Sequence, residues 1–327
     1  MGANGDGRPG GRDAASWRSK GFWGEAFGWR DSASPRVLPR VVVFGVISSS
    51  ICIAGRGHPR LELPVGPHEV AGAVLGLLLV LRTNAGYERW WEARKLWGGI
   101  VNQTRNLAIQ ALCYGPDDPR WREDVVRWTI AFAHASRRSL RGERALPELE
   151  SLLGKAGADR VARSAHMPIA VARVVGGLLR EAHDDGRMSG FAFHQAERER
   201  ATLIDHIGAC ERIFKTPLPA AYSIKIRRFL VLFLVTLTFA LFHKFQSDWL
   251  VPPFLMLVAY PVLAVDQIGA ELQNPFATRN LGHLPLDDIC GTIERNLLGL
   301  VDEGGKPAGE GAAPEPEEQG RCDPREP

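Results

Sequence analysis

Residues Leu77 to Gly98 read LLLVLRTNAGYERWWEARKLWG and join an apolar stretch directly to a polar stretch rich in tryptophan. Apolar residues recur at helical spacing on both sides of Arg82, and no proline interrupts the pattern before about Leu112. The segment therefore predicts one long helix that begins near Val70. Its first half suits a bilayer, and its second half suits water.

Three further apolar runs accompany this one, so that the four are Val37–Ala54, Val70–Leu81, Phe229–Phe242 and Trp249–Ala264. Each run is shorter than the roughly 20 residues that cross a hydrocarbon core, so a soluble helical bundle is the competing interpretation. The last two runs, however, carry no polar stripe of the kind that a water-facing helix shows. Arginine and lysine also gather at one end of the runs, which favours a membrane protein with both termini and the middle region in the cytoplasm.

Composition excludes several classes of function. The 327 residues carry 40 Lys and Arg against 37 Asp and Glu, and a net charge of +3 is too small to indicate a nucleic-acid partner. The five cysteines are widely spaced, so we expect free thiols rather than disulfides or a zinc site. No signal peptide, phosphate-binding loop or nucleophile motif is present. The sequence predicts no enzymatic activity, no cofactor and no metal.

The chain divides by composition into two tails and one domain. Residues 1–16 and 303–327 are rich in Gly, Pro and charge, and we expect them to be disordered. Residues 17–302 are predicted to form one domain, with membrane helices at about 37–55, 67–82, 228–243 and 249–266. The cytosolic helical region covers about 83–225 and 267–302. Its predicted helices are Trp121–Leu140, Pro147–Ser164, Pro168–His183, Ser189–Phe214 and Leu286–Leu300.

The tract RTNAGYERWWEARKLWG closely resembles the signature of the prokaryotic bestrophin-like family, which follows the second membrane helix of that family. Three more tracts resemble the family in the same order: SASPRVLPRVV from Ser32, CERIFKTPLPAAYSIKIRR from Cys210, and the segment 266–298 that contains NPF. The signature residues are Arg82, Asn84, Tyr87, Arg89, Trp90, Trp91, Arg94, Asn274, Pro275 and Phe276.

The resemblance implies an all-α membrane protein with four transmembrane helices and a cytosolic helical bundle, assembled as a homopentamer around a central pore. Such a protein lies in the bilayer of the cell inner membrane and passes monovalent ions passively. The family is described as one of chloride channels. The sequence leaves two alternatives open: a bacterial bestrophin homologue that is permeable to cations such as sodium, and a non-conducting membrane scaffold.

The resemblance also implies which residues narrow the pore. Ala73, Leu77 and Leu81 stand four residues apart on one helical face, where the family has an apolar neck that can close by dewetting. Ala73 is smaller than the bulky residue usual at its position. Leu218, between two prolines, matches a second constriction at the cytosolic exit. Without the resemblance, the first three would be ordinary packing residues and Leu218 an ordinary loop residue.

Charged residues near the signature have expected roles as well. We expect its arginines to pair with Glu88 or Glu92 or to stack on tryptophan, and its aromatic residues to anchor the helix at the membrane surface. Animal bestrophins bind calcium through acids that follow NPF, whereas here Ala-Thr-Arg-Asn follows, so we predict no calcium site. Asp266 and Glu271 are expected to form salt bridges at a subunit interface, with a cation site as the alternative.

Overall fold

The structure is a computed structural model that describes residues 22–26, 28–29, 32–55, 63–242, 245 and 247–304. The tails that we expect to be disordered lie outside these residues, except that residues 303 and 304 end the last helix. Every regular element in the described part of the chain is helical, as predicted. The elements are α1 (Phe22–Ala26), α2 (Ser34–Ala54), α3 (Val65–Tyr114), α4 (Pro119–Leu140), α5 (Pro147–Arg163), α6 (Met167–Asp184), α7 (Gly190–Lys215), α8 (Ala220–Phe242), η3 (Asp248–Leu250), α9 (Val251–Glu271) and α10 (Leu286–Gly304).

The longest helix is α3, whose 50 residues run without a break through the whole tract from Leu77 to Gly98. The sequence predicts this continuity and an end near Leu112, two residues before the observed end at Tyr114. Pro39 and Arg40 interrupt the first apolar run in the sequence, yet α2 continues through both residues. The helices of the middle region form close to their predicted bounds, and α4, α5 and α6 each have a proline in the first turn, where its missing N–H leaves no bond unmade.

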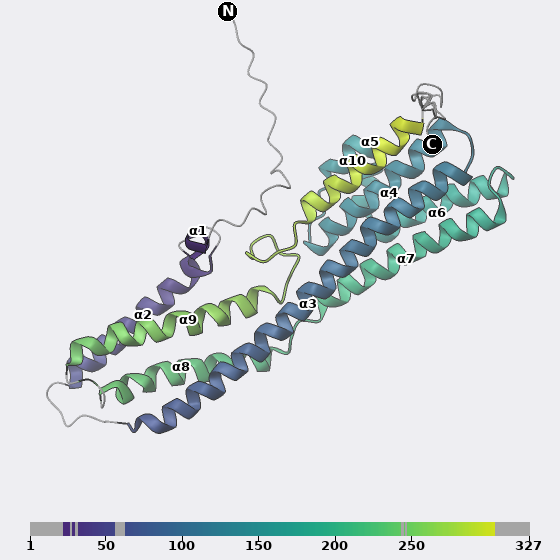
Figure 1. Ribbon diagram of the computed structural model, residues 1–327. Coiled ribbons are helices and arrows are strands. Elements are labelled where there is room, and N and C mark those ends of the chain that lie inside the picture. The colour runs from purple at the N-terminus through teal and green to yellow at the C-terminus, as the bar shows by residue number, and fades with distance from the viewer. Residues whose placement is uncertain are drawn as a thin grey trace, which may run out of the picture. The chain divides into compact units, whose positions relative to one another are not determined.

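The chain packs as two compact units. The first unit comprises residues up to Lys95 and from Arg212 to Leu284, and thus α2, the first part of α3, α8 and α9. The second comprises Leu96 to Glu211 and the residues from Pro285 onward, and thus α4 to α6, most of α7, and α10. In the first unit α2 and α9 lie side by side along their length (Figure 1).

The core of the first unit is apolar and comes from all four of its long helices. A Cβ atom at Gly45 of α2 would lie 2.6 Å from the sulfur of Met256 on α9, so the glycine lets these two helices approach closely. The buried side chains of this core are Val37, Val41, Phe44, Leu75, Leu79, Ile226, Leu230, Phe233, Leu234, Leu255, Ala259 and Leu263.

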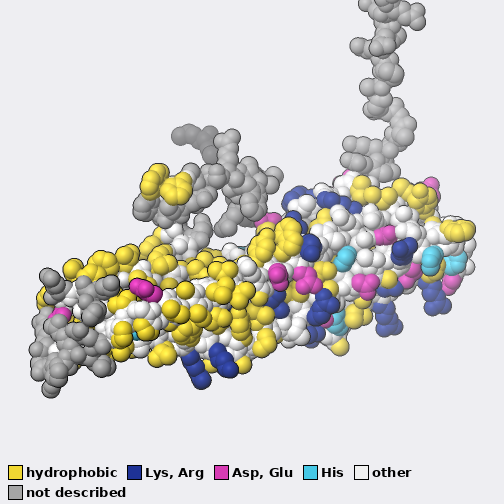
Figure 2. All heavy atoms as spheres, turned by 60° about the horizontal axis from the view of Figure 1, so that its bottom comes forward, with side chains coloured by type: hydrophobic (Ala, Val, Ile, Leu, Met, Phe, Trp, Pro, Cys, Tyr) yellow, Lys and Arg dark blue, Asp and Glu magenta, His cyan; other side chains and the backbone are white. Residues whose placement is uncertain are grey.

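The outer surface of the first unit is also apolar. Hydrophobic side chains gather over its helices, whereas charged side chains gather over the second unit (Figure 2). Exposed aliphatic residues include Val46 on α2, Leu232 on α8 and Leu257 on α9. By length and composition, α2, α3 and the helix from Asp248 to Glu271 could each cross a membrane. The helix predicted as the third span, α8, is not among them, because three basic residues lie in its first nine positions.

A buried ion pair joins α3 to α9 inside the first unit. The guanidinium of Arg82 donates to Asp266, and the two residues are only 1% and 2% exposed. Arg227 of α8 adds a second contact, its Nε lying 3.3 Å from Oδ2 of Asp266. Burying a charge without a partner is costly, so this arrangement requires all three helices to hold their places.

The second unit holds a charged cluster at the end of α4. Arg137, which is 4% exposed, donates to Glu148 of α5 at 2.6 Å and to Asp287 of α10 at 2.7 Å. Arg138 donates to the same oxygen of Glu148 at 2.5 Å. Partial burial alone would raise the pKa of Glu148, but the hydrogen bonds from Arg138 and Arg137 outweigh it and lower the pKa to about 2.

We predict that Arg82→Ala destabilises the full chain strongly, because it removes the main partner of a buried carboxylate. The expected loss is about 3–5 kcal/mol of unfolding free energy, the usual result of breaking a buried pair. Arg94→Ala, on the exposed side of the same helix, is the matched control. Thermal melting in detergent measures both variants, and equal melting temperatures for the two would contradict a stabilising role of the buried pair.

We also predict that Glu148 makes the stability of the protein depend on acid pH. Its folded pKa of about 2 lies below the ordinary value of 4.5, so its contribution is full above pH 4.5 and is lost as the pH falls towards 2. The melting temperature of Glu148→Gln should therefore lie below that of the wild type at pH 7, and the gap should narrow below pH 4.5. Glu150→Gln, in the same turn but exposed, should show no such convergence. A gap for Glu148→Gln that is constant with pH would rule the effect out.

Candidate functional site

The first part of α3 has two opposite faces. Leu75, Leu79 and Arg82 lie on the face that packs into the first unit, and all three are buried. Ala73, Leu77 and Leu81 lie on the other face, and Leu77 and Leu81 are 60% and 51% exposed. A helix repeats its faces every three or four residues, so the spacing that buries one set turns the other outward. The three residues of the predicted neck therefore share one exposed face.

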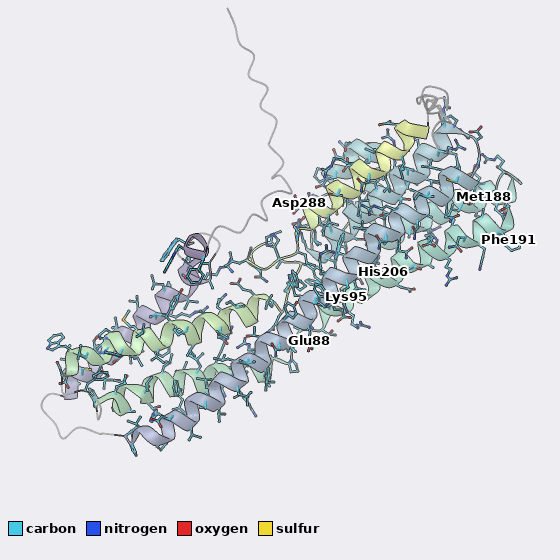
Figure 3. The ribbon with its side chains drawn as sticks, viewed as in Figure 1. Glu88, Lys95, Met188, Phe191, His206 and Asp288 are labelled. Atoms are coloured by element: carbon cyan, nitrogen blue, oxygen red, sulfur yellow. The ribbon has the colours of Figure 1, made fainter. Side chains whose placement is uncertain are left out.

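This exposed face continues into the signature tract with a change of chemistry. Four exposed residues follow Leu81 at intervals of three or four positions: Asn84, Glu88, Trp91 and Lys95. Glu88 and Lys95 can be followed along α3 in Figure 3. We call the exposed set of Ala73, Leu77, Leu81, Asn84, Glu88, Trp91 and Lys95 the outward stripe. The outward stripe is apolar up to Leu81 and polar or aromatic beyond it.

Arg89 connects the signature tract to the end of α7 and to the segment after α9 by donating hydrogen bonds to backbone carbonyls. Its guanidinium donates to the carbonyl oxygens of Ile213 at 2.5 Å, Thr216 at 2.8 Å and Gln273 at 3.2 Å. The carbonyl of Ile213 lies in the last turn of α7 and that of Thr216 directly follows the helix, where carbonyls have no partner in the helix and favour a cation. Arg89 therefore caps α7 and holds the start of the segment that leads to α8.

The expected pairing of signature arginines with Glu88 or Glu92 is wrong for Arg82 and Arg89. Arg82 pairs with Asp266, and Arg89 binds backbone oxygens. Glu92 pairs instead with Arg212 at 2.9 Å, which lies outside the signature. The sequence shows which acids lie near Arg82 on the same helix. It does not show that Asp266, 184 residues away, is the partner.

The aromatic residues of the signature stack on one another. The rings of Tyr87, Trp90 and Trp91 lie nearly parallel, with centroids 6.1 to 6.5 Å apart. Trp90 is half-buried, and its indole N–H donates to the carbonyl of Gly282 at 2.7 Å. Trp91 is exposed. Trp90 therefore packs within the unit, while Tyr87 and Trp91 remain available at the surface.

The NPF element shapes the segment after α9. The side-chain oxygen of Asn274 accepts from the backbone N–H of Phe276 at 3.2 Å, and Phe276 is fully buried. The carbonyl of Pro275, which is also buried, accepts from the N–H of Leu284 at 2.8 Å. These two hydrogen bonds therefore close the loop after α9. Across the part of the chain that the structure describes, no three His, Cys, Asp or Glu side chains are grouped to hold a metal.

Leu218 lies in the non-helical link from Thr216 to Pro219, between the end of α7 and the start of α8. The prolines on either side fix the backbone in an extended form and exclude a helix there, as the sequence predicts. The side chain of Leu218 is half-buried. Its assignment to a second constriction stays a prediction.

Asp266 and Glu271 both form salt bridges within the chain. Asp266 binds Arg82 and Arg227, as described above. Glu271 binds Arg36 of α2 and accepts from Gln267 at 2.7 Å and from the N–H of Leu281 at 3.1 Å. These partners belong to the same chain, and the expected salt bridges at a subunit interface stay a prediction. Sequence reasoning missed Arg36 and Arg227 as partners, although each stands at the basic end of an apolar run.

The comparisons with known proteins agree with this architecture. The family described as Bacterial/Fungal Bestrophin protein matches residues 15–299. A voltage-dependent anion channel-forming protein of Synechocystis sp. is 31% identical over 277 residues, which cover 84% of this chain and 89% of that protein. A protein of the same description from Escherichia coli K12 is 31% identical over 284 residues, covering 86% and 92% of the two chains.

A solved structure is similar as well. The crystal structure of a bacterial bestrophin homolog from Klebsiella pneumoniae matches with a TM-score of 0.74 and 26% sequence identity, covering 81% of this chain and 98% of that one. The family match spans most of the 327 residues and includes both the signature tract and the NPF element. The chain therefore belongs to the bacterial and fungal bestrophin family.

Proposed function

We propose that this protein is the subunit of a homopentameric anion channel in the cell inner membrane, with α2, the first part of α3, α8 and α9 as its four membrane-crossing segments. Both termini and the second unit then lie in the cytoplasm. The observation that carries the proposal is the outward stripe of α3. Its leucines are exposed in the single chain, although the opposite face of the same helix is packed.

An exposed apolar stripe of this kind requires an apolar neighbour or a pore that can dry. Five copies of α3 around one axis would bring five copies of Leu77 and of Leu81 together as rings. Such rings close a narrow pore to ions by excluding water, without any plug. Ala73 leaves more room than a leucine would, so we place the closure at Leu77 and Leu81.

The basic start of α8 is compatible with a membrane-crossing role. After Arg228 the helix continues with 14 residues that include no Asp, Glu, Lys or Arg. The long side chains of Lys225 and Arg228 are exposed and can extend to the water at the membrane surface. Arg227 is half exposed and lies 3.3 Å from Asp266, a carboxylate that it shares with Arg82. The three basic residues, which keep α8 from counting as a membrane span by composition, therefore lie at its N-terminal end. A bilayer tolerates charge there, at the membrane surface.

The proposed anion selectivity rests on the relatives. The relatives from Synechocystis and Escherichia coli are named as anion channel-forming proteins. Where α3 leaves the proposed membrane segment, its exposed residues include Arg94 and Lys95 against Glu88. Arg94 is not part of the outward stripe, and Glu88 and Lys95 within the stripe balance each other, so the relatives carry the proposed selectivity.

Recording from purified full-length protein in planar bilayers under a potassium chloride gradient tests the proposal. We predict that the current reverses near the equilibrium potential of chloride, which is opposite in sign to that of potassium. Bilayers without protein should pass no current. The mass of the purified oligomer in detergent should correspond to five chains.

Two results would contradict the proposal in different ways. A reversal potential of the opposite sign would replace anion by cation selectivity but keep the pore. A particle with only one or two chains would remove the central pore itself, because α3 could not close a ring.

A further inference from the structure

A groove on the surface of the first unit lies between α2 and α8 and has α9 as its floor. It encloses about 380 Å³. Its apolar part is lined by Val43 and Phe44 of α2, Leu230 and Val231 of α8, and Leu263 of α9. Its polar part is lined by Arg40, Arg227 and Asp266 from the same three helices. The groove therefore has an apolar part and a charged end.

The charged end carries a positive excess. Asp266 is the acid that lines the groove, and it already binds both Arg82 and Arg227. Arg40 donates to the neutral side-chain oxygen of Gln267 at 3.0 Å, which positions its guanidinium without neutralising it. Three arginines around one carboxylate leave two positive charges uncompensated. Arg227 is 53% exposed, so its charge can be reached from the surface.

The two parts of the groove follow the direction of the helices. Arg40 and Arg227 stand near the starts of α2 and α8, and Asp266 stands near the end of α9. Val43, Leu230 and Leu263 lie about one turn further toward the middle of their helices. In a bilayer, the arginines would face the cytosolic headgroups and the apolar lining would face acyl chains.

We propose that this groove binds one anionic phospholipid per chain, with its phosphate between Arg40 and Arg227 and an acyl chain along Val43, Phe44 and Val231. Arginine forms strong, charge-assisted hydrogen bonds to phosphate oxygens, and two arginines can share one phosphate. A small soluble anion would gain nothing from the apolar lining, whereas a neutral lipid would leave the positive excess unmatched. The proposal rests on the membrane placement of the first unit and not on conduction.

Native mass spectrometry of the intact oligomer in detergent tests this binding directly. The probes are phosphatidylglycerol and phosphatidylethanolamine with the same acyl chains, added in equal amounts. We predict that phosphatidylglycerol is retained in preference, up to one molecule per chain. Arg40→Gln should weaken its retention by about five-fold, the effect of one basic residue at an anionic membrane surface. This variant leaves the contacts of Asp266 with Arg82 and Arg227 in place.

Two further variants separate the site from general attraction to lipid. Arg228→Gln removes the same charge from the next position of α8, which does not line the groove, and should lower retention far less than Arg40→Gln. Val43→Trp fills the exposed apolar part without changing any charge and should reduce retention as well.

Several results would overturn the proposal. Equal retention of the two lipids by the wild type would remove the charge selectivity, and an equal loss in Arg228→Gln would reduce it to nonspecific attraction. Displacement by glycerol phosphate at the same concentration as lipid would show that the apolar lining contributes nothing. Retention of no lipid by the intact oligomer would show that a neighbouring chain covers the groove. Each of these outcomes leaves the conduction measurement unaffected.

Discussion

The buried contact between Arg82 and Asp266 fixes how α3 is rotated against α9. Arg82 stands where the apolar half of α3 ends, and its burial turns the helix so that Leu75 and Leu79 face the core. Leu77 and Leu81 must then face outward, because residues two positions apart on a helix point in nearly opposite directions. One ion pair therefore determines which leucines the helix can offer to a pore.

The same pair connects α3 to the groove between α2 and α8. Asp266 also holds Arg227, which lines the groove between α2 and α8 together with Arg40. An anionic phosphate at Arg227 would compete with Asp266 for that guanidinium, and Asp266 is the partner of Arg82. A lipid bound as proposed above would therefore meet the same carboxylate that contacts Arg82 of α3.

The sequence predicts the helices well, because their signals are local. The unbroken periodicity around Arg82 predicts α3, and prolines mark the first turns of α4, α5 and α6. It also places Ala73, Leu77 and Leu81 on one face, but only packing decides that this face is exposed. The partners of Arg82 and Arg89 could not be predicted, since Asp266, Gln273 and Ile213 are far away in the sequence and lie on other elements. Glu88 and Glu92 are close to Arg89 in the sequence and therefore suggest an ion pair, but Arg89 binds backbone carbonyls instead.

The most direct test of the outward stripe as a pore lining is the current through Leu77→Ala, recorded beside Leu257→Ala. Both substitutions shorten an exposed leucine by the same amount, but Leu257 lies on α9, away from the proposed axis. The account predicts a larger current per oligomer for Leu77→Ala, because five shorter side chains widen and wet the neck. It predicts an unchanged current for Leu257→Ala. A current in Leu77→Ala that equals that of the wild type and of Leu257→Ala would contradict the placement of the neck on α3.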